Sequence, residues 1–230
     1  MSRAPLLLLL LLAAPLLFAQ RYHLELEATP AGVFPYLGRF GAVELHVYRS
    51  GVRAEALWLN GLAKNGSSAV TVANPLGRMY VDVPIGEIAS ILRRIAGDDG
   101  SVERAIAPPT RGPSTAGKVH GINATRHRLV YGPSAWIDYW TTTAIPENPQ
   151  FRRIADQLVA GISPGTAQVA RSIPGMPVYI ELNFRRFKKV PVLKVKELTM
   201  NPSAEDEEDA LELGPLYMRA PLLDRVLSRD

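Results

Sequence analysis

The chain lacks cysteine altogether, and that absence removes several kinds of chemistry. No disulfide can form, and neither a thiolate nucleophile nor a thiolate metal ligand is available. The cysteine that is lipidated directly after the signal of a bacterial lipoprotein is missing as well. Side-chain packing must therefore hold the fold together, and anchoring through a lipidated cysteine is excluded.

A strong charge imbalance and the common catalytic motifs are also missing. The 230 residues include 26 basic and 22 acidic side chains, which gives a formal net charge of +4. This excess is weak, so we predict no nucleic-acid partner. The sequence contains no Gly-x-Ser-x-Gly elbow, no phosphate-binding P-loop, no His-Glu-x-x-His pair and no Rossmann glycine fingerprint. No catalytic residue and no cofactor is therefore predicted.

A leucine-rich segment stands out at the N-terminus. Nine leucines lie within residues 6–17, and Arg3 precedes them. A basic residue, a short apolar core and a small residue such as Ala19 are the three parts of an export signal. A membrane-spanning helix needs about 20 apolar residues, which is more than this segment offers. We predict a cleaved signal at 1–19 and a single periplasmic or secreted domain over 20–230, with no integral membrane segment after cleavage. A retained hydrophobic helix is the alternative.

The first half of the chain alternates between apolar and polar residues, as strands with one buried face do. This alternation predicts strands at 22–28, 43–48, 52–58, 69–73 and 78–83. The turn Arg49-Ser50-Gly51 joins the second and third of these strands into a hairpin. From Ile85 to Ile95 the apolar residues recur at helical spacing, which predicts a helix.

In the second half, a segment rich in proline and glycine comes first, at 107–118, and we predict an exposed loop there. Alternation then predicts strands at 119–131, 135–143, 178–184 and 191–200. Helical spacing predicts helices over 149–162 and 166–173, the first with an apolar stripe of Phe151, Ile154, Ala155, Leu158 and Ile162. The predicted fold class is α+β, with an antiparallel sheet whose apolar face the helices cover.

Aromatic residues are the candidates for a ligand-binding site, because their rings can line a cleft while their polar tips orient a bound molecule. Core packing is the alternative explanation for them. The candidates are Trp58, Trp136, Trp140 and Tyr139. Asp138 shares a strand face with Trp136 and Trp140, so its carboxylate must be solvated, paired or perturbed. We expect it to be exposed to solvent.

Two histidines with neighbouring acids form the best candidate for metal binding or acid–base chemistry. They are His23 with Glu25 and His46 with Glu44, which pairing of the first two strands would bring together on the polar face. Solvated cross-strand pairs explain the same pattern. We therefore predict no metal site from these residues.

Four segments resemble an uncharacterised exported bacterial family related to the LolA/LolB-like lipoprotein carriers. They are 117–124 (GKVHGINA), 135–141 (AWIDYWT), 175–180 (GMPVYI) and 194–198 (KVKEL). The resemblance covers about residues 20–200 and implies a strongly curved antiparallel sheet, an incomplete barrel whose concave face is covered by helices and can enclose an apolar cavity. It implies no particular binding residue.

Sequence and resemblance together favour a noncatalytic exported protein that binds a lipid, a lipoprotein or another apolar ligand between sheet and helices. Two alternatives remain open. One is an envelope interaction or sensor protein that uses the sheet as a docking surface. The other is an enzyme or metal-binding protein organised around His23, His46 or Asp138.

Overall fold

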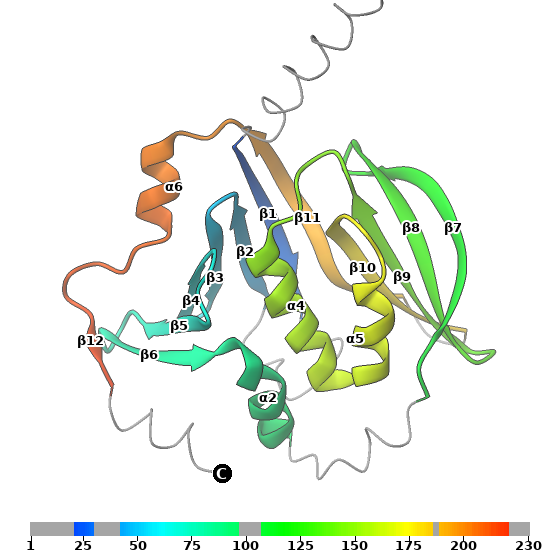
Figure 1. The fold of residues 1–230 in the computed structure, drawn as a ribbon, viewed down its shortest axis with the longest axis horizontal. Coiled ribbons are helices and arrows are strands. Elements are labelled where there is room, and N and C mark those ends of the chain that lie inside the picture. The colour runs from blue at the N-terminus through cyan, green and yellow to red at the C-terminus, as the bar shows by residue number, and fades with distance from the viewer. Residues whose placement is uncertain (1–20, 30–41, 97–106, 186–188, 221–230) are drawn as a thin grey trace, which may run out of the picture.

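The computed structural model describes residues 21–29, 42–96, 107–185 and 189–220 (Figure 1), so the predicted signal at 1–19 lies outside it. The strands within these residues are β1 (Tyr22–Ala28), β2 (Val43–Tyr48), β3 (Gly51–Ala56), β4 (Leu59–Lys64), β5 (Ala69–Asn74), β6 (Met79–Pro84), β7 (Thr110–Val119), β8 (Ile122–Tyr131), β9 (Ala135–Thr142), β10 (Met176–Phe184), β11 (Val190–Met200) and β12 (Met218–Arg219). The helices are α2 (Ile88–Ala96), which follows the 3-10 turn η3 (Ile85–Glu87), α4 (Pro149–Ile162), α5 (Pro164–Arg171) and α6 (Ala204–Ala210).

All twelve of these strands belong to one sheet, in the order β12-β6-β5-β4-β3-β2-β1-β11-β10-β9-β8-β7. Neighbouring strands run antiparallel, except that β12 is parallel to β6. The sheet is open, with β12 and β7 as its two end strands. The predicted α+β class with an antiparallel sheet is confirmed.

The central strand β1 shows the alternation on which the prediction rested. Leu24 and Leu26 are fully buried, whereas His23 and Glu25 are only partly buried. Both leucines belong to the same apolar cluster as Phe151 of α4, so this face of the sheet points to the helix. Burying one such leucine side chain contributes roughly 1.5–3 kcal/mol. The opposite face of β1 carries the polar side chains.

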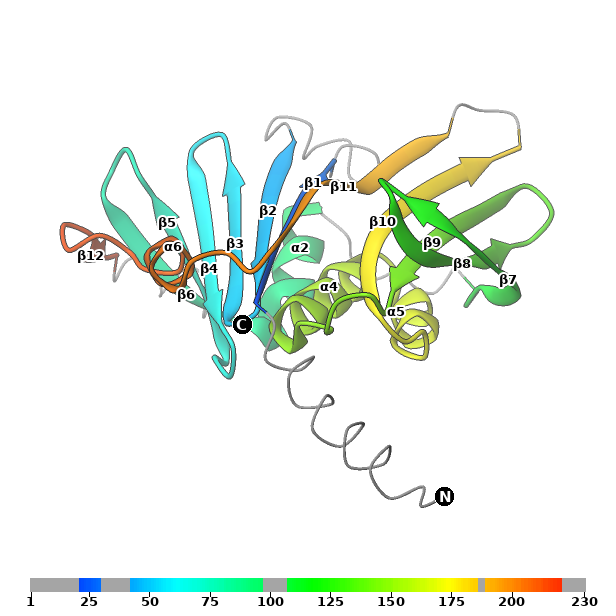
Figure 2. The same cartoon turned by 90° about the horizontal axis from the view of Figure 1, so that it is seen from above.

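Helix α4 begins at a strong cap that also attaches it to the sheet. The Asn148 side chain accepts a hydrogen bond from the N–H of Phe151 at 2.8 Å, and Pro149 occupies the first turn, where a missing N–H leaves no bond unmade. The Asn148 amide also donates to the carbonyl of Tyr48 in β2 at 2.6 Å. Ser163 ends α4 and caps α5. Figure 2 shows α2, α4 and α5 gathered on one side of the sheet.

The predicted loop at 107–118 is wrong, because most of this segment forms β7. As the end strand of the sheet, β7 pairs with β8, and the pairing register shifts between Arg111 and Ser114, which flank Pro113. Proline lacks the N–H that a ladder needs, and it is tolerated at such irregularities and on edge strands. In this segment, a composition rich in proline and glycine, which is typical of loops, forms an irregular edge strand instead.

The alternation did not predict strand β4, helix α6 or strand β12. The predicted strand at 52–58 ends at Ala56, because Leu57 and Trp58 form a tight turn into β4. The acidic helix α6 begins at Ser203, whose side chain accepts a hydrogen bond from the N–H of Asp206 at 3.0 Å. The chain then returns to the sheet as β12 beside β6.

Candidate functional site

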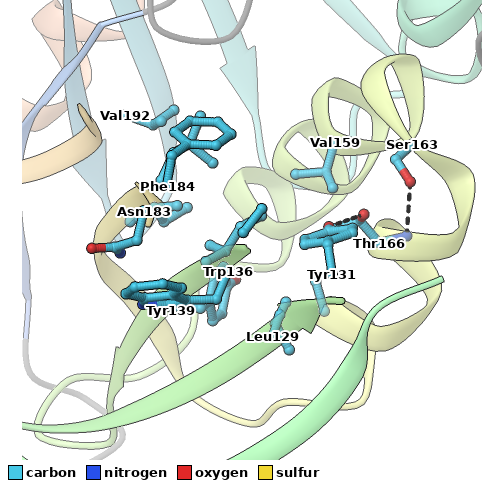
Figure 3. A pocket seen from close by; sticks show the side chains of 15 residues that line it. Leu129, Tyr131, Trp136, Tyr139, Val159, Ser163, Thr166, Asn183, Phe184 and Val192 are labelled. Carbon is cyan, nitrogen blue, oxygen red and sulfur yellow. Dashed lines mark hydrogen bonds between the residues drawn. The ribbon is translucent and has the colours of Figure 1, made fainter. Parts of the chain in front are cut away.

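An apolar cavity of about 350 Å³ lies between strands β8–β11 and helices α4 and α5 (Figure 3). Its walls come from all of these elements and from the residue that joins the helices. The lining residues are Leu129, Tyr131, Ala135, Trp136, Ile137, Tyr139, Val159, Ser163, Thr166, Ala170, Ile180, Leu182, Asn183, Phe184 and Val192. A concave, mainly apolar space with a few polar groups is what a small-molecule site requires.

The polar groups in the cavity wall are largely occupied by bonds within the protein. The Tyr131 hydroxyl and the Thr166 hydroxyl are hydrogen-bonded, which joins β8 to α5. The Ser163 hydroxyl accepts a hydrogen bond from the N–H of Thr166 at 3.3 Å. Burial raises the pKa of the Tyr131 phenol, and it also raises that of Tyr139. The cavity wall therefore presents neutral groups, and these suit an apolar guest better than a charged one.

Small residues on α5 leave room for this cavity. Thr166, Ala167 and Ala170 are the buried residues of the helix, and two of them, Thr166 and Ala170, line the cavity. Along α4, Val159 lines the cavity, whereas Leu158, expected on the buried stripe, is 41% exposed. These helix residues were not predicted as site residues, although the run of small side chains on α5 is visible in the sequence.

Two of the four aromatic candidates line the cavity, namely Trp136 and Tyr139. Tyr139 is buried and packs in a cluster with Leu129 of β8 and Ile173, which follows α5. The Trp136 indole N–H donates to Asp138 at 3.3 Å, and the guanidinium carbon of Arg128 lies 5.1 Å from its ring centroid. Trp136 thus lines the cavity, while its indole N–H is hydrogen-bonded to the carboxylate of the Arg128–Asp138 ion pair.

Trp140 lies outside the cavity lining and packs against the end strand instead. A Cβ atom at Gly117 would come within 2.9 Å of the Trp140 ring, so any larger residue there would push the ring out of its position. On the same face, the guanidinium carbon of Arg126 lies 5.9 Å from the ring centroid. Trp140 therefore holds β7, β8 and β9 together.

Trp58 is separated from the other aromatic candidates by several strands. It lies in the turn between β3 and β4 and is 40% exposed. Between β4 and β9 the sheet order places β3, β2, β1, β11 and β10. The structure does not bring Trp58 together with Trp136, Trp140 and Tyr139.

The expectation that Asp138 is exposed is wrong, because this residue is buried, with only 6% of its surface accessible to solvent. Arg128, directly opposite on β8, binds it through two bonds of 2.9 and 3.2 Å. The Trp136 indole and the Asn183 amide donate to the same carboxylate, the latter at 3.4 Å. A carboxylate held by one cation and two neutral donors is a structural ion pair, with its acceptor positions already used.

The predicted histidine constellation does assemble, on the face of the sheet turned away from α4. Pairing of β1 with β2 sets Glu25 opposite His46 and His23 opposite Tyr48. The Nε2 atom of His23 lies 3.0 Å from Nδ1 of His46. Burial, followed by the neighbouring His46, lowers the pKa of His23. Two imidazoles and several carboxylates thus share one polar surface.

A third histidine forms a polar cluster in the other half of the sheet. His127 is buried, with its Nδ1 3.0 Å from the Ser114 hydroxyl and its Nε2 3.2 Å from the Thr141 hydroxyl. Burial, followed by the positive charge of Arg111, lowers its pKa. Spacing on a single strand could not reveal this cluster, because its members come from β7, β8 and β9.

The chain matches no protein-family model and no curated protein. The resemblance to the LolA/LolB-like carriers therefore stays a prediction. Within the described ranges, none of the helices has the length and apolar character that crossing a membrane requires.

Proposed function

We propose that the protein is an exported, noncatalytic binding protein that holds a lipid, a lipoprotein chain or another apolar molecule between its sheet and helices. The observation that carries this proposal is the cavity lined by β8–β11, α4 and α5. Its volume of about 350 Å³ lies within the range of ligand pockets, roughly 300–1,000 Å³. An acyl chain would replace water against carbon-rich walls, at a gain of about 0.8 kcal/mol for each buried CH₂ group.

The arrangement of the sheet supports the same proposal. The end strands β7 and β12 do not pair with each other, and helices α2, α4 and α5 gather on one side (Figure 2). We interpret this as an incomplete barrel whose inner face is lined by α2, α4 and α5. Such an architecture leaves an interior space that a ligand can enter without the sheet having to open.

The leucine segment at 6–17, with Arg3 before it and Ala19 after it, supports export. The resemblance to exported lipoprotein carriers agrees with both the location and the ligand class. Intact mass of protein recovered from the exported fraction tests this part. A mature chain that still begins at Met1 would contradict it.

Ligand binding is tested best with two adjacent positions on α4. Val159 lines the cavity, whereas Leu158 is 41% exposed. Val159→Phe should fill the space and weaken binding of a fluorescent fatty-acid analogue by about tenfold, while Leu158→Phe should leave binding unchanged. Native mass spectrometry of gently purified protein should reveal a bound apolar molecule. A ligand-free protein that fails to bind the probe, or equal effects of both variants, would overturn the proposal.

An envelope interaction protein is the second candidate, and exposed apolar side chains favour it. Leu57, Leu76, Leu216 and Met218 are 80%, 86%, 62% and 68% exposed. Leu57 lies in the β3–β4 turn, Leu76 in the β5–β6 turn, Leu216 just before β12 and Met218 within β12, all in the half of the sheet that ends at β12. Contiguous exposed apolar surface commonly marks contact with a partner. This candidate takes precedence if the cavity proves to bind nothing.

A further inference from the structure

Three potential metal ligands meet on the polar face of the sheet, and none of them lines the cavity. Glu44 and His46 belong to β2, and Glu55 belongs to β3 directly opposite Glu44. One ligand atom from each of the three side chains lies within 4.8 Å of the other two. Two carboxylates that face each other across a strand pair repel, so this arrangement favours a cation between them.

His23 on the neighbouring strand orients the imidazole of this group. Its Nε2 atom lies 3.0 Å from Nδ1 of His46, and its ring stacks on Tyr48 at a centroid distance of 4.5 Å with an interplanar angle of 5°. When His46 donates its Nδ1–H to His23, its Nε2 keeps a free lone pair. Metal-binding histidines are commonly held in this way through their second nitrogen, which fixes both tautomer and ring orientation.

The cations that now contact the two carboxylates have other partners. Lys196 binds Glu44 at 2.7 Å and Glu25 at 2.5 Å. Arg53 binds Glu55 at 2.5 Å and donates to the carbonyl of Ala210 at 3.0 Å. If Glu44 and Glu55 turn toward a metal, each cation keeps its second bond, so the rearrangement leaves no cation without a partner.

The site is also accessible from solvent. The side chains of Glu44 and Glu55 are 46% and 40% exposed, so an ion can enter without any strand moving. One imidazole and two carboxylates suit a borderline divalent ion such as Zn²⁺, which takes nitrogen and oxygen ligands, whereas Mg²⁺ and Ca²⁺ prefer oxygen alone.

We propose that Glu44, His46 and Glu55 form a binding site for one Zn²⁺-like divalent ion, with His23 as the residue that positions His46. Strand β2 lies two positions from β11, the nearest strand that lines the cavity, and the site is on the opposite face of the sheet from the cluster of Leu24 and Phe151. It does not depend on the apolar cavity, and either can exist without the other.

Calorimetric titration of the purified protein with ZnCl₂ tests this inference. We expect one Zn²⁺ per chain and no comparable binding of MgCl₂. His46→Gln or Glu55→Gln should abolish the binding, and His23→Gln should weaken it by about 10- to 100-fold. His120→Asn is the matched control, because His120 lies in an exposed turn with φ of 47°, a conformation that asparagine tolerates.

Thermal unfolding in EDTA shows whether each variant still folds, and addition of ZnCl₂ should raise the melting temperature of the original protein but not that of His46→Gln. Absence of zinc binding by the original protein would overturn the inference. Binding that survives in His46→Gln or that disappears in His120→Asn would overturn it equally.

Discussion

The two halves of the sheet use tryptophan and charge in opposite ways. In the C-terminal half (β7–β11 with α4 and α5), Trp140 rests on Gly117 and the carboxylate of Asp138 is buried in an ion pair. In the N-terminal half (β1–β6 with α2), Trp58 lies in an exposed turn, and the carboxylate of Glu44 is 46% exposed. The two halves belong to one continuous sheet, joined where β1 pairs with β11, so the difference comes from the side chains and not from a break in the backbone architecture.

This difference separates two tasks. Buried pairs and aromatic packing stiffen the C-terminal half around its cavity, since a packed wall is needed to define an interior space. The N-terminal half keeps its polar groups within reach of solvent on one face, and it exposes apolar side chains at its turns. We infer that the C-terminal half holds a guest, while the N-terminal half faces ions or partners.

The largest expected effect compares the two tryptophans directly. Trp140→Ala should lower the free energy of unfolding by about 3 kcal/mol, because it removes a ring that fills the space over Gly117. Trp58→Ala should change it by less than about 1 kcal/mol, because that side chain is at a turn and 40% exposed. Urea unfolding of both variants measures the difference. Equal losses would mean that the two halves pack their aromatic residues alike.

Local patterns were sufficient for the strands and helices that have one clearly apolar side. The alternation in β1 and the capped, amphipathic α4 agree closely with the ranges that the sequence predicts. The two strands of the β8–β9 hairpin were likewise anticipated, since the turn at Gly132, whose φ is 65°, interrupts two alternating segments. In each of these elements, neighbours in sequence decide the structure.

The errors arose where distant residues decide the structure. Pro113 and Gly117 suggested a loop, but an edge strand with a shifted register accommodates the first, and the ring of Trp140 requires the second. The exposure expected for Asp138 was wrong because its partner Arg128 comes from another strand. No local pattern reveals which guanidinium will face a given carboxylate.

The cavity was the least predictable feature. Two aromatic candidates, Trp136 and Tyr139, do line it, but its size depends on α5 presenting Thr166 and Ala170 opposite β8–β10. A cavity is space that side chains leave unfilled, so it depends on how far helices stand from the sheet. Periodicity in the sequence carries no information on that distance.

The second prediction concerns the ion pairs that distinguish the two halves. Arg128→Met should cost about 2 kcal/mol, because it leaves the buried carboxylate of Asp138 without its cation. We place the cost below that of a fully buried pair, since the Arg128 side chain is 35% exposed and two neutral donors remain. Lys196→Met, in the exposed pairs with Glu25 and Glu44, should cause no clear loss. Chemical unfolding at low and high salt measures both. If the loss of stability caused by Arg128→Met depended on salt as strongly as that caused by Lys196→Met, the Arg128–Asp138 pair would not be shielded from solvent as its burial indicates.

A third prediction separates binding from stability at the cavity wall. Trp136→Ala should weaken binding of the fluorescent fatty-acid analogue by about tenfold, because it removes part of the lining. Trp140→Ala should leave the affinity of the molecules that still fold unchanged, since its ring packs on Gly117 instead. Probe titration below the unfolding transition measures both affinities. A loss of affinity caused only by Trp140→Ala would reverse the assignment of the two rings.

The smallest effect is a pH dependence that the buried histidine of the C-terminal half imposes. Burial and Arg111 lower the pKa of His127 in the folded protein below its ordinary value of 6.5. Below that pH the unfolded chain takes up the proton more readily than the folded one, so the free energy of unfolding must fall as the pH drops from about 6.5 toward the folded-state pKa. Well above pH 6.5 both states are neutral at this residue, and it contributes no slope. His127→Gln keeps an amide that can bond to Ser114 and Thr141 but cannot titrate, so its stability should fall less steeply between pH 7.5 and pH 5. The slope that remains belongs to other groups, among them His23 in the N-terminal half, whose pKa is also lowered.

Urea unfolding across this range, with His120→Asn as the control at an exposed turn, measures the difference in slope. Identical slopes for His127→Gln and the original protein would show that the cluster around His127 accepts the proton without cost, and that the C-terminal half is less rigidly packed there than its contacts indicate.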